Sequence, residues 1–233
     1  MARWVSDAAF HSLRKQAMLD PLDDFRFQRG IDLLTNAGAV LDADVTWLDL
    51  GCHQGQFLKK LIAQYSVRGI GSDDWNAAQK SAADSHWEYF QADLDRELPW
   101  PEPGVDVISA LEVLEHMIDT DGFLRRIFDK LKPDGWLLLS TPNINCLRNR
   151  VMVPLGVYPT GLEYRNQIHH VRLYNAPALR GHLIEHGFDD VRIIGVSFLP
   201  LSSPVGVSAL SMHLADRLPE WCNNIIAVAR KPH

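Results

Sequence analysis

Residues 47–55 read "WLDLGCHQG", and this stretch decides the fold. A short apolar run ends at Asp49, and Gly51 and Gly55 then bracket a turn that leads into a helix-forming segment. Glycine permits backbone conformations closed to other residues and lets a ligand approach closely. A strand-to-helix turn also offers backbone N–H groups to an anionic or carboxylate-bearing ligand. We therefore predict a cofactor loop, in which His53 stands where another glycine is usual.

The spacing of these glycines separates the loop from two other nucleotide-binding loops. It does not follow G-x-G-x-x-G, and no Gly-Lys-Ser/Thr follows to cradle phosphates. A dinucleotide site and a phosphate-binding loop are therefore disfavoured. The remaining alternative is a tight strand–helix corner with incidental glycines.

The composition is that of an ordinary globular chain. Of 233 residues, 46% are hydrophobic and 22% are charged, which fits one domain spanning residues 1–233. The formal charge of −6 argues against a sequence-independent nucleic-acid partner. Three widely spaced cysteines and no recognisable signal peptide lead us to expect a cytoplasmic protein. The uncharged stretch 193–212 contains two prolines, so we expect no stable membrane insertion.

Short apolar runs alternate with helix-length segments along most of the chain. This rhythm predicts an α/β fold, with a mostly parallel sheet and helices on both faces. The carboxyl ends of parallel strands meet at one edge, where such sheets bind ligands. We therefore expect Asp49, Asp73 and Asp93 to project from that edge.

Three regions depart from this rhythm. Two helices, near Asp7–Leu19 and Asp23–Ala37, would form a cap over residues 1–40. Residues 142–170 hold three prolines and no clear long helix, so we predict a lid or binding loop. Residues 198–218 are expected to form an apolar loop that receives an apolar substrate or forms a homodimer contact.

Five segments in order resemble the signature series of class I S-adenosylmethionine-dependent methyltransferases. The similarity extends from about Val45 to Phe188, and it is strongest with small-molecule methyltransferases of ubiquinone, methionine and cell-surface polysaccharide pathways. It implies a Rossmann-like sheet of seven strands whose last strand is antiparallel. The segments are "DLGCHQG", "VRGIGSDD", "QADLDREL", "ALEVLEH" and "LKPDGWLLLSTPN".

The resemblance implies a binding site for S-adenosylmethionine. His53 replaces the usual glycine, so its side chain would trim the pocket or contact the cofactor. The residues implied around the methionine end are Asp49, Gly51, Cys52 and Gly55.

The other end of the cofactor is assigned in the same way. The ribose-binding acid usually follows the "G-I" pair directly, but Gly71 stands there, so we choose Asp73. A carboxylate can accept hydrogen bonds from both ribose hydroxyls. Asp74 is the fallback. Asp93 and the backbone of Leu94 would contact adenine, and Leu111 completes the cofactor set.

The acceptor side of the site is predicted from "EVLEH", which follows the fourth strand. Histidine is the natural base for a hydroxyl acceptor near neutral pH, so His116 is the first candidate and His170 the second. In ubiquinone-pathway relatives this segment is associated with a divalent cation, for which Glu112 or Glu115 could be ligands. Such residues are also common at helix starts without metal, so we assign no metal site.

Aromatic side chains supply the remaining candidates. Three tyrosines, Tyr158, Tyr164 and Tyr174, would line the acceptor pocket together with Glu112. His182 and His186 share a helix face but lack the glutamate of a zinc-hydrolase motif, so we expect a solvated face.

These patterns together predict methyl transfer from S-adenosylmethionine to a small-molecule acceptor, with a hydroxyl oxygen as the expected target. The shifted acid and His53 leave one alternative open. It is a non-catalytic accessory protein that retains the methyltransferase fold.

Overall fold

A computed structural model describes residues 21–74, 82, 87–98, 104–159, 170–196, 198, 202–203, 206–207 and 209–233. The expected helix at Asp7–Leu19 lies outside the described residues. The core of the fold lies within them.

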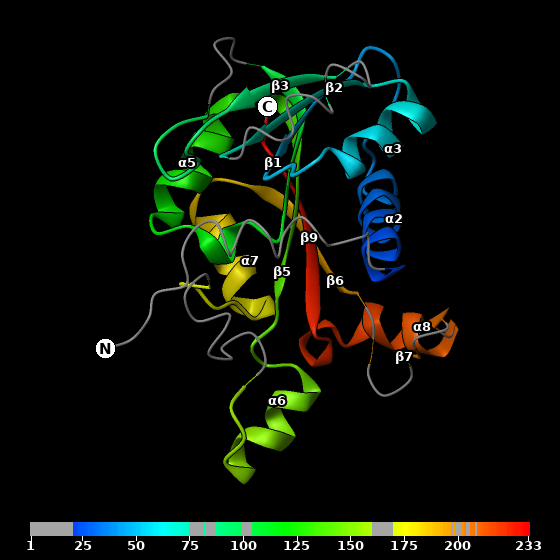
Figure 1. The fold of residues 1–233 in the computed structure, drawn as a ribbon, viewed down its shortest axis with the longest axis vertical. Coiled ribbons are helices and arrows are strands. Elements are labelled where there is room, and N and C mark those ends of the chain that lie inside the picture. The colour runs from blue at the N-terminus through cyan, green and yellow to red at the C-terminus, as the bar shows by residue number, and fades with distance from the viewer. Residues whose placement is uncertain are drawn as a thin grey trace.

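The centre of the molecule is a seven-stranded sheet in the order β3-β2-β1-β4-β5-β9-β6 (Figure 1). Strand β9 is antiparallel to both of its neighbours, and the other pairings in the sheet are parallel. The Rossmann-like sheet with an antiparallel last strand is therefore confirmed. The strands are β1 (Thr46–Leu50), β2 (Arg68–Asp73), β3 (Glu88–Gln91), β4 (Val105–Leu111), β5 (Leu131–Pro142), β6 (Asp189–Gly195) and β9 (Asn224–Arg230).

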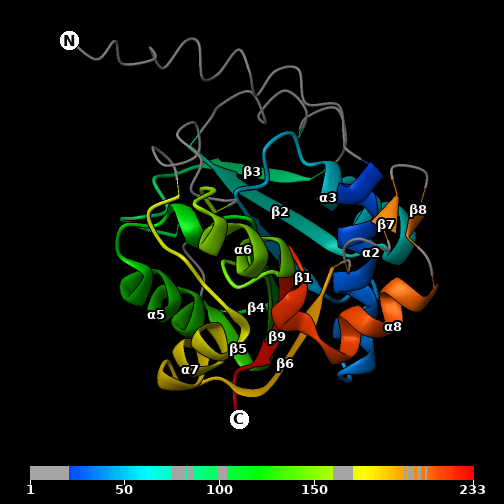
Figure 2. The same cartoon turned by 90° about the horizontal axis from the view of Figure 1, so that it is seen from below.

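Helices cover both faces of this sheet (Figure 2). The segments α2 and α3 pack on one face and α5 and α7 on the other, each over its own cluster of buried apolar side chains. Among the described residues, no helix combines the length and the apolar character needed to cross a membrane. The helices are α2 (Pro21–Asn36), α3 (Gln56–Tyr65), α5 (Thr120–Lys130), α6 (Leu147–Met152), α7 (Ala176–Glu185) and α8 (Ala209–Arg217).

Local signals set where these helices begin. The Asp119 carboxylate accepts a hydrogen bond from Gly122 N, and the Asn175 side chain accepts one from Ala178 N. Each bond satisfies an amide that has no partner within its helix. The apolar loop expected over 198–218 differs from the structure, because α8 occupies its second half after a short hairpin of β7 (Ser202–Ser203) and β8 (Gly206–Val207).

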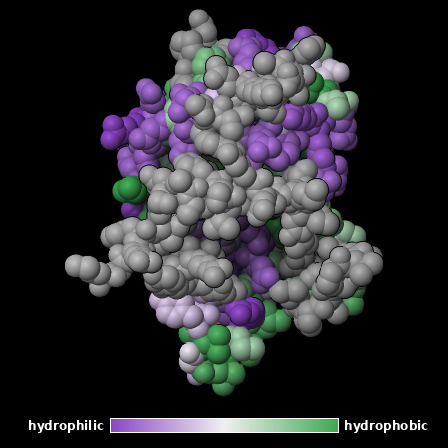
Figure 3. Space-filling model, in the orientation of Figure 1, coloured by the Kyte–Doolittle hydropathy of each residue, from purple (hydrophilic) through white to green (hydrophobic). Residues whose placement is uncertain are grey.

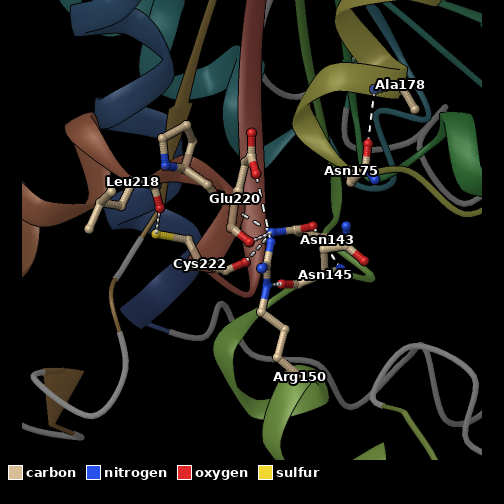
Figure 4. Close-up of polar contacts among 9 residues, drawn as sticks. Asn143, Asn145, Arg150, Asn175, Ala178, Leu218, Glu220 and Cys222 are labelled. Atoms are coloured by element: carbon tan, nitrogen blue, oxygen red, sulfur yellow. Dashed lines mark hydrogen bonds and ion pairs between the residues drawn. The ribbon is translucent and has the colours of Figure 1, made fainter.

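The segment after β5 is anchored at its start and projects beyond it. The buried Asn143 side chain donates to the carbonyl oxygens of Glu220 and Cys222, which precede β9 (Figure 4). Short helix α6 and the turn η2 (Val153–Leu155) then extend away from the sheet, and Figure 3 shows hydrophobic side chains gathered at their tip. The exposed apolar side chains there are Val151, Val153, Leu155 and Val157.

A chain of buried hydrogen bonds joins β1 to β4. Trp47 Nε1 donates to Ser109 Oγ at 2.8 Å, and Ser109 Oγ donates to Asp49 Oδ1 at 2.6 Å. Burial raises the pKa of Asp49 to about 7, the Ser109 hydroxyl opposes this shift, and the charge of Asp73 adds to it. The protonated form of Asp49 is therefore favoured by folding.

This shift predicts a pH-dependent effect of Asp49→Asn on stability. Because the pKa of Asp49 is raised on folding, its favourable contribution is complete below its unfolded value of 3.8 and is lost as pH rises through about 7. Asparagine does not titrate, and its oxygen can still accept from Ser109. The free energy of unfolding of Asp49→Asn relative to wild type should therefore rise between about pH 5 and about pH 8, by on the order of 1 kcal/mol or more.

Denaturant unfolding across this pH range measures the difference. Asp44→Asn, at an exposed position, is the matched control and should show no comparable trend. A constant difference for Asp49→Asn would mean that the buried carboxyl does not titrate in this range.

Candidate active site

A pocket of about 480 Å³ opens at the carboxyl ends of β1, β2 and β4. Strand β1 pairs with β2 on one side and β4 on the other, so the chain leaves the sheet in different directions there. Such a switch point is where open α/β sheets bind ligands. The lining residues are Gly51, His53, Asp73, Asp74, Asp93, Leu94, Asp95, Glu112, Val113, His116, Met117, Ile118 and Val171.

The two glycines of the opening loop have different roles. Gly51 has a φ of 69° and lines the pocket, and a Cβ there would overlap the Val113 side chain. Gly55 has a φ of 73° and precedes α3, but a Cβ there would overlap the Trp87 ring. Gly51 therefore leaves space at the pocket, whereas Gly55 leaves space for core packing.

His53 adopts the left-handed conformation with a φ of 50°. Its backbone N donates to Asp73 Oδ2 at 2.9 Å, which ties the β1 loop to the end of β2. Both residues line the pocket, and Asp73 is 5% exposed. The structure thus accommodates His53 in a glycine-like conformation and uses its amide to hold the acid.

A second pair of acids closes the same side of the pocket. Asp93 Oδ1 accepts from Asp95 N at 3.1 Å, so the two residues form a tight turn after β3. Asp95 Oδ1 in turn accepts from Ile118 N at 2.8 Å. Arg126 Nη2 donates to the carbonyl oxygens of Leu94 and Asp95, which fixes the backbone of the turn. The turn after β3 and the segment after β4 are therefore joined across the pocket.

Glu112 is held by its neighbours at the pocket wall. It has a φ of 57°, a conformation that costs free energy for a non-glycine residue. Its Oε1 accepts from Ser140 Oγ at 2.8 Å and lies 3.2 Å from Arg26 Nη1, and its Oε2 accepts from Asn224 Nδ2 at 2.9 Å. Because both oxygens are engaged, Glu112 is better suited to holding β4, β5 and β9 together than to binding a metal.

The next turn, η1 (Leu114–His116), brings Glu115, His116 and His170 together. Ligand atoms of these three side chains lie within 4.8 Å of one another, and the two imidazole rings meet edge to face with centroids 4.8 Å apart. Glu115 is 2% exposed, and neither carboxylate oxygen has a hydrogen-bond partner among the described residues. Burial, followed by the charge of Glu112, holds the pKa of Glu115 well above its usual range.

Four residues assigned to the cofactor lie outside the pocket lining, so their binding roles stay predictions. Asp49 is an interior residue of β1 and bonds to Ser109, so it does not project into the pocket. Cys52 is buried, and burial raises the pKa of its thiol, so it is a core residue without pocket exposure. Gly55 and Leu111 also lie outside the lining, because they pack toward α3 and the adjacent apolar cluster.

Two of the tyrosines expected around the acceptor lie outside the pocket lining. Tyr174 is 7% exposed, and its hydroxyl lies 3.0 Å from His182 Nδ1 on α7 rather than at the pocket. Tyr158 is 58% exposed and follows η2, outside the pocket lining. Tyr164 lies outside the described residues. Aromatic composition alone could not place these side chains, because their direction depends on how the segment after β5 folds.

Five pocket residues were not singled out as site residues from the sequence. Asp95 competes with Asp93 in the motif "QADLD", Val113 lies within "EVLEH", and Met117 and Ile118 follow that segment directly. These signals could have identified four of them; nothing in the sequence pattern indicates the fifth, Val171. The five are Asp95, Val113, Met117, Ile118 and Val171.

Comparison with known proteins places this geometry in a family. A family model described as a methyltransferase domain matches residues 22–193. A probable S-adenosylmethionine-dependent methyltransferase of Mycobacterium tuberculosis is 32% identical over 151 residues, covering 64% of this chain and 50% of that protein. A ubiquinone biosynthesis O-methyltransferase of Bradyrhizobium diazoefficiens is 34% identical over 125 residues, covering 52% and 47%. The chain thus spans about half the length of these curated relatives.

Solved structures show the same fold at low sequence identity. A methyltransferase from Archaeoglobus fulgidus described as dependent on S-adenosylmethionine has a TM-score of 0.66 at 20% identity, covering 97% of this chain and all of that one. A phosphoethanolamine N-methyltransferase of Haemonchus contortus, bound to phosphomonomethylethanolamine and S-adenosylhomocysteine, has a TM-score of 0.62 at 15% identity, covering 88% and 53%. With the family match over most of the chain, this protein belongs to the class I S-adenosylmethionine-dependent methyltransferase family.

Proposed function

We propose that this protein transfers the methyl group of S-adenosylmethionine to a hydroxyl oxygen of a small-molecule acceptor. The observation that carries the proposal is the pocket at the switch point, whose lining includes His116 and the carboxylates of four aspartates. Negative charge in a cleft favours a cationic sulfonium ligand. The four carboxylates belong to Asp73, Asp74, Asp93 and Asp95.

The residues on one side of the pocket suit the cofactor. Asp73, held by the His53 amide at the end of β2, is the residue we assign to the ribose hydroxyls. Asp93 and Leu94 in the turn after β3 are assigned to adenine, and Gly51 and His53 to the methionine end. S-adenosylmethionine would supply an activated methyl group, so the protein must mainly align the acceptor and exclude water.

The other side of the pocket suits an acceptor whose proton must be removed. His116 lines the pocket and has His170 beside it, and Met117 and Val171 add apolar surface. Removal of a hydroxyl proton by an imidazole makes the acceptor oxygen a stronger nucleophile. A ubiquinone biosynthesis O-methyltransferase among the relatives supports oxygen as the target, and N-methyltransferases among the structural neighbours make nitrogen the alternative to be tested.

Asp73→Asn should weaken binding of S-adenosylhomocysteine by about tenfold or more. Hydrogen bonds to charged groups contribute about 1.5–3 kcal/mol, and 1.4 kcal/mol is one decade in affinity. Asparagine keeps an oxygen for the His53 amide, so the loop should stay in place. Asp74→Asn is the matched control, and calorimetry measures both.

The two variants also test the register of the assignment. A larger loss with Asp74→Asn would move the ribose contact by one residue. Failure of the wild-type protein to bind S-adenosylhomocysteine at all would instead favour an accessory protein that retains only the fold.

His116→Ala should slow the chemical step by roughly 10²–10⁴-fold, the usual contribution of a general base. Binding of S-adenosylhomocysteine should hardly change, because His116 is assigned to the acceptor. The measurement is release of S-adenosylhomocysteine in single turnovers with a panel of hydroxylated and amine acceptors. His170→Ala is run beside it, because the neighbouring ring is the second candidate base.

Two results would count against this assignment. Full activity in His116→Ala together with a large loss in His170→Ala would exchange the two roles. Loss of cofactor binding in His116→Ala would show that the residue supports the pocket instead of acting on the acceptor.

A divalent cation is a second candidate at the same place, because Glu115, His116 and His170 bring ligand atoms together. A bound cation would polarise the acceptor hydroxyl. Glu112, the other candidate ligand, is already engaged through both of its oxygens, so we expect activity to survive treatment with EDTA. Loss of activity that Mg²⁺ or Zn²⁺ restores in wild type, but not in Glu115→Gln, would assign a metal instead.

A further inference from the structure

A second histidine cluster lies outside the pocket, where α5 and α7 pack side by side (Figure 1). His182 Nε2 lies 2.8 Å from Asp121 Oδ1, and His186 Nε2 lies 3.6 Å from the same oxygen. The histidine side chains are only 14% and 11% exposed, whereas Asp121 is 73% exposed. The solvated helix face expected for His182 and His186 is therefore wrong.

We propose that Asp121, His182 and His186 bind a single transition-metal ion of the zinc class. This site is separate from the methyltransferase pocket and does not depend on the function proposed for it.

The spacing of the ligand atoms fits one small ion. Ligands about 2.0–2.1 Å from a tetrahedral zinc ion are separated from each other by roughly 3.3 Å. The distances of 2.8 and 3.6 Å from Asp121 Oδ1 lie on either side of this value. All three ligand atoms lie within 4.8 Å of one another, so small side-chain rotations would suffice.

The other ring nitrogen of each histidine already has a partner. His186 Nδ1 lies 2.9 Å from the His182 carbonyl oxygen. A carbonyl can only accept, so this nitrogen carries the proton and Nε2 of the neutral ring presents its lone pair to the cluster. His182 Nδ1 lies 3.0 Å from the Tyr174 hydroxyl. Such outer partners orient metal-binding histidines in proteins.

The set of donors selects the class of metal. Two imidazoles and one carboxylate suit Zn²⁺, Cu²⁺ or Ni²⁺, whereas Mg²⁺ and Ca²⁺ prefer oxygen ligands. Three protein ligands leave a fourth position for water. The exposed Asp121 gives the ion access from solvent.

Bound metal would connect α5 and α7 through the side chains of Asp121, His182 and His186. Asp121 lies in the first turn of α5, and His182 and His186 lie on α7 and at its end. Binding to the folded state alone would raise the stability of the protein with metal concentration. The expected role is therefore a clamp between α5 and α7.

Zinc titration of the full chain tests the proposal. The protein is stripped with EDTA, the chelator is removed, and Zn²⁺ is titrated in competition with a chromophoric zinc indicator near neutral pH. Wild type should bind zinc, and binding should raise its melting temperature. His186→Gln and Asp121→Asn should each weaken binding by at least about tenfold, the loss seen when even an outer partner is removed.

Two control variants identify which histidines are responsible. His213→Gln changes an exposed histidine on α8, and His170→Gln disrupts the histidine cluster at the pocket. Neither should alter the zinc affinity of the α5–α7 site. Circular dichroism of metal-free His186→Gln and Asp121→Asn must match wild type, and Asp121→Asn serves as the conservative variant because its side chain is exposed.

The proposal is overturned by either of two results. Equal zinc affinity in wild type, His186→Gln and Asp121→Asn would leave the cluster as a hydrogen-bonded surface ion pair. A loss of zinc binding in His170→Gln, with none in His186→Gln, would move the metal to the pocket.

Discussion

The parallel pairing of β1 with both β2 and β4 is the constraint on which the site depends. The connections that follow two neighbouring strands run in different directions here. They leave a crevice between them at the ends of the strands. The buried bonds from Trp47 through Ser109 to Asp49 hold β1 and β4 in register below this crevice. Burying these polar groups costs desolvation free energy. The hydrogen bonds nevertheless fix the register of β1 against β4, because a shift of one strand would leave each buried group without its partner.

The pocket wall contains two non-glycine residues in the left-handed conformation, His53 and Glu112. One follows β1 and the other follows β4, so both stand where the chain turns away from the sheet. Their hydrogen bonds offset the conformational cost: His53 N binds Asp73, and Glu112 N donates to the Ser140 carbonyl at 3.0 Å. A strained backbone conformation persists only where surrounding contacts hold it in place. Such residues are often found at ligand sites.

The sequence predicts those elements that depend on apolar spacing or on residues close by in the chain. The strands and the helices at α3, α5 and α7 follow from apolar spacing and from capping residues such as Asp119. Asp73, which we chose for the ribose hydroxyls, is the last residue of β2 and lines the pocket. Its binding role stays a prediction.

Direction and long-range pairing could not be predicted in the same way. Asp49 lies one residue before the end of β1, and that single position turns its carboxyl from the pocket to Ser109. Tyr174 was expected at the acceptor, but its bridge to Asn143 directs it toward α7. The contact of Asp121 with His182 spans 61 residues, so no helical spacing could reveal it.

The short segment 170–174 lies between the two histidine clusters. At one end His170 meets His116, and at the other Tyr174 meets His182. Between them the amides of residues 171 and 172 bond to the Glu115 carbonyl at 2.8 and 3.1 Å. A metal ion at the α5–α7 cluster could change the pocket only if its affinity differed between two conformations of this segment.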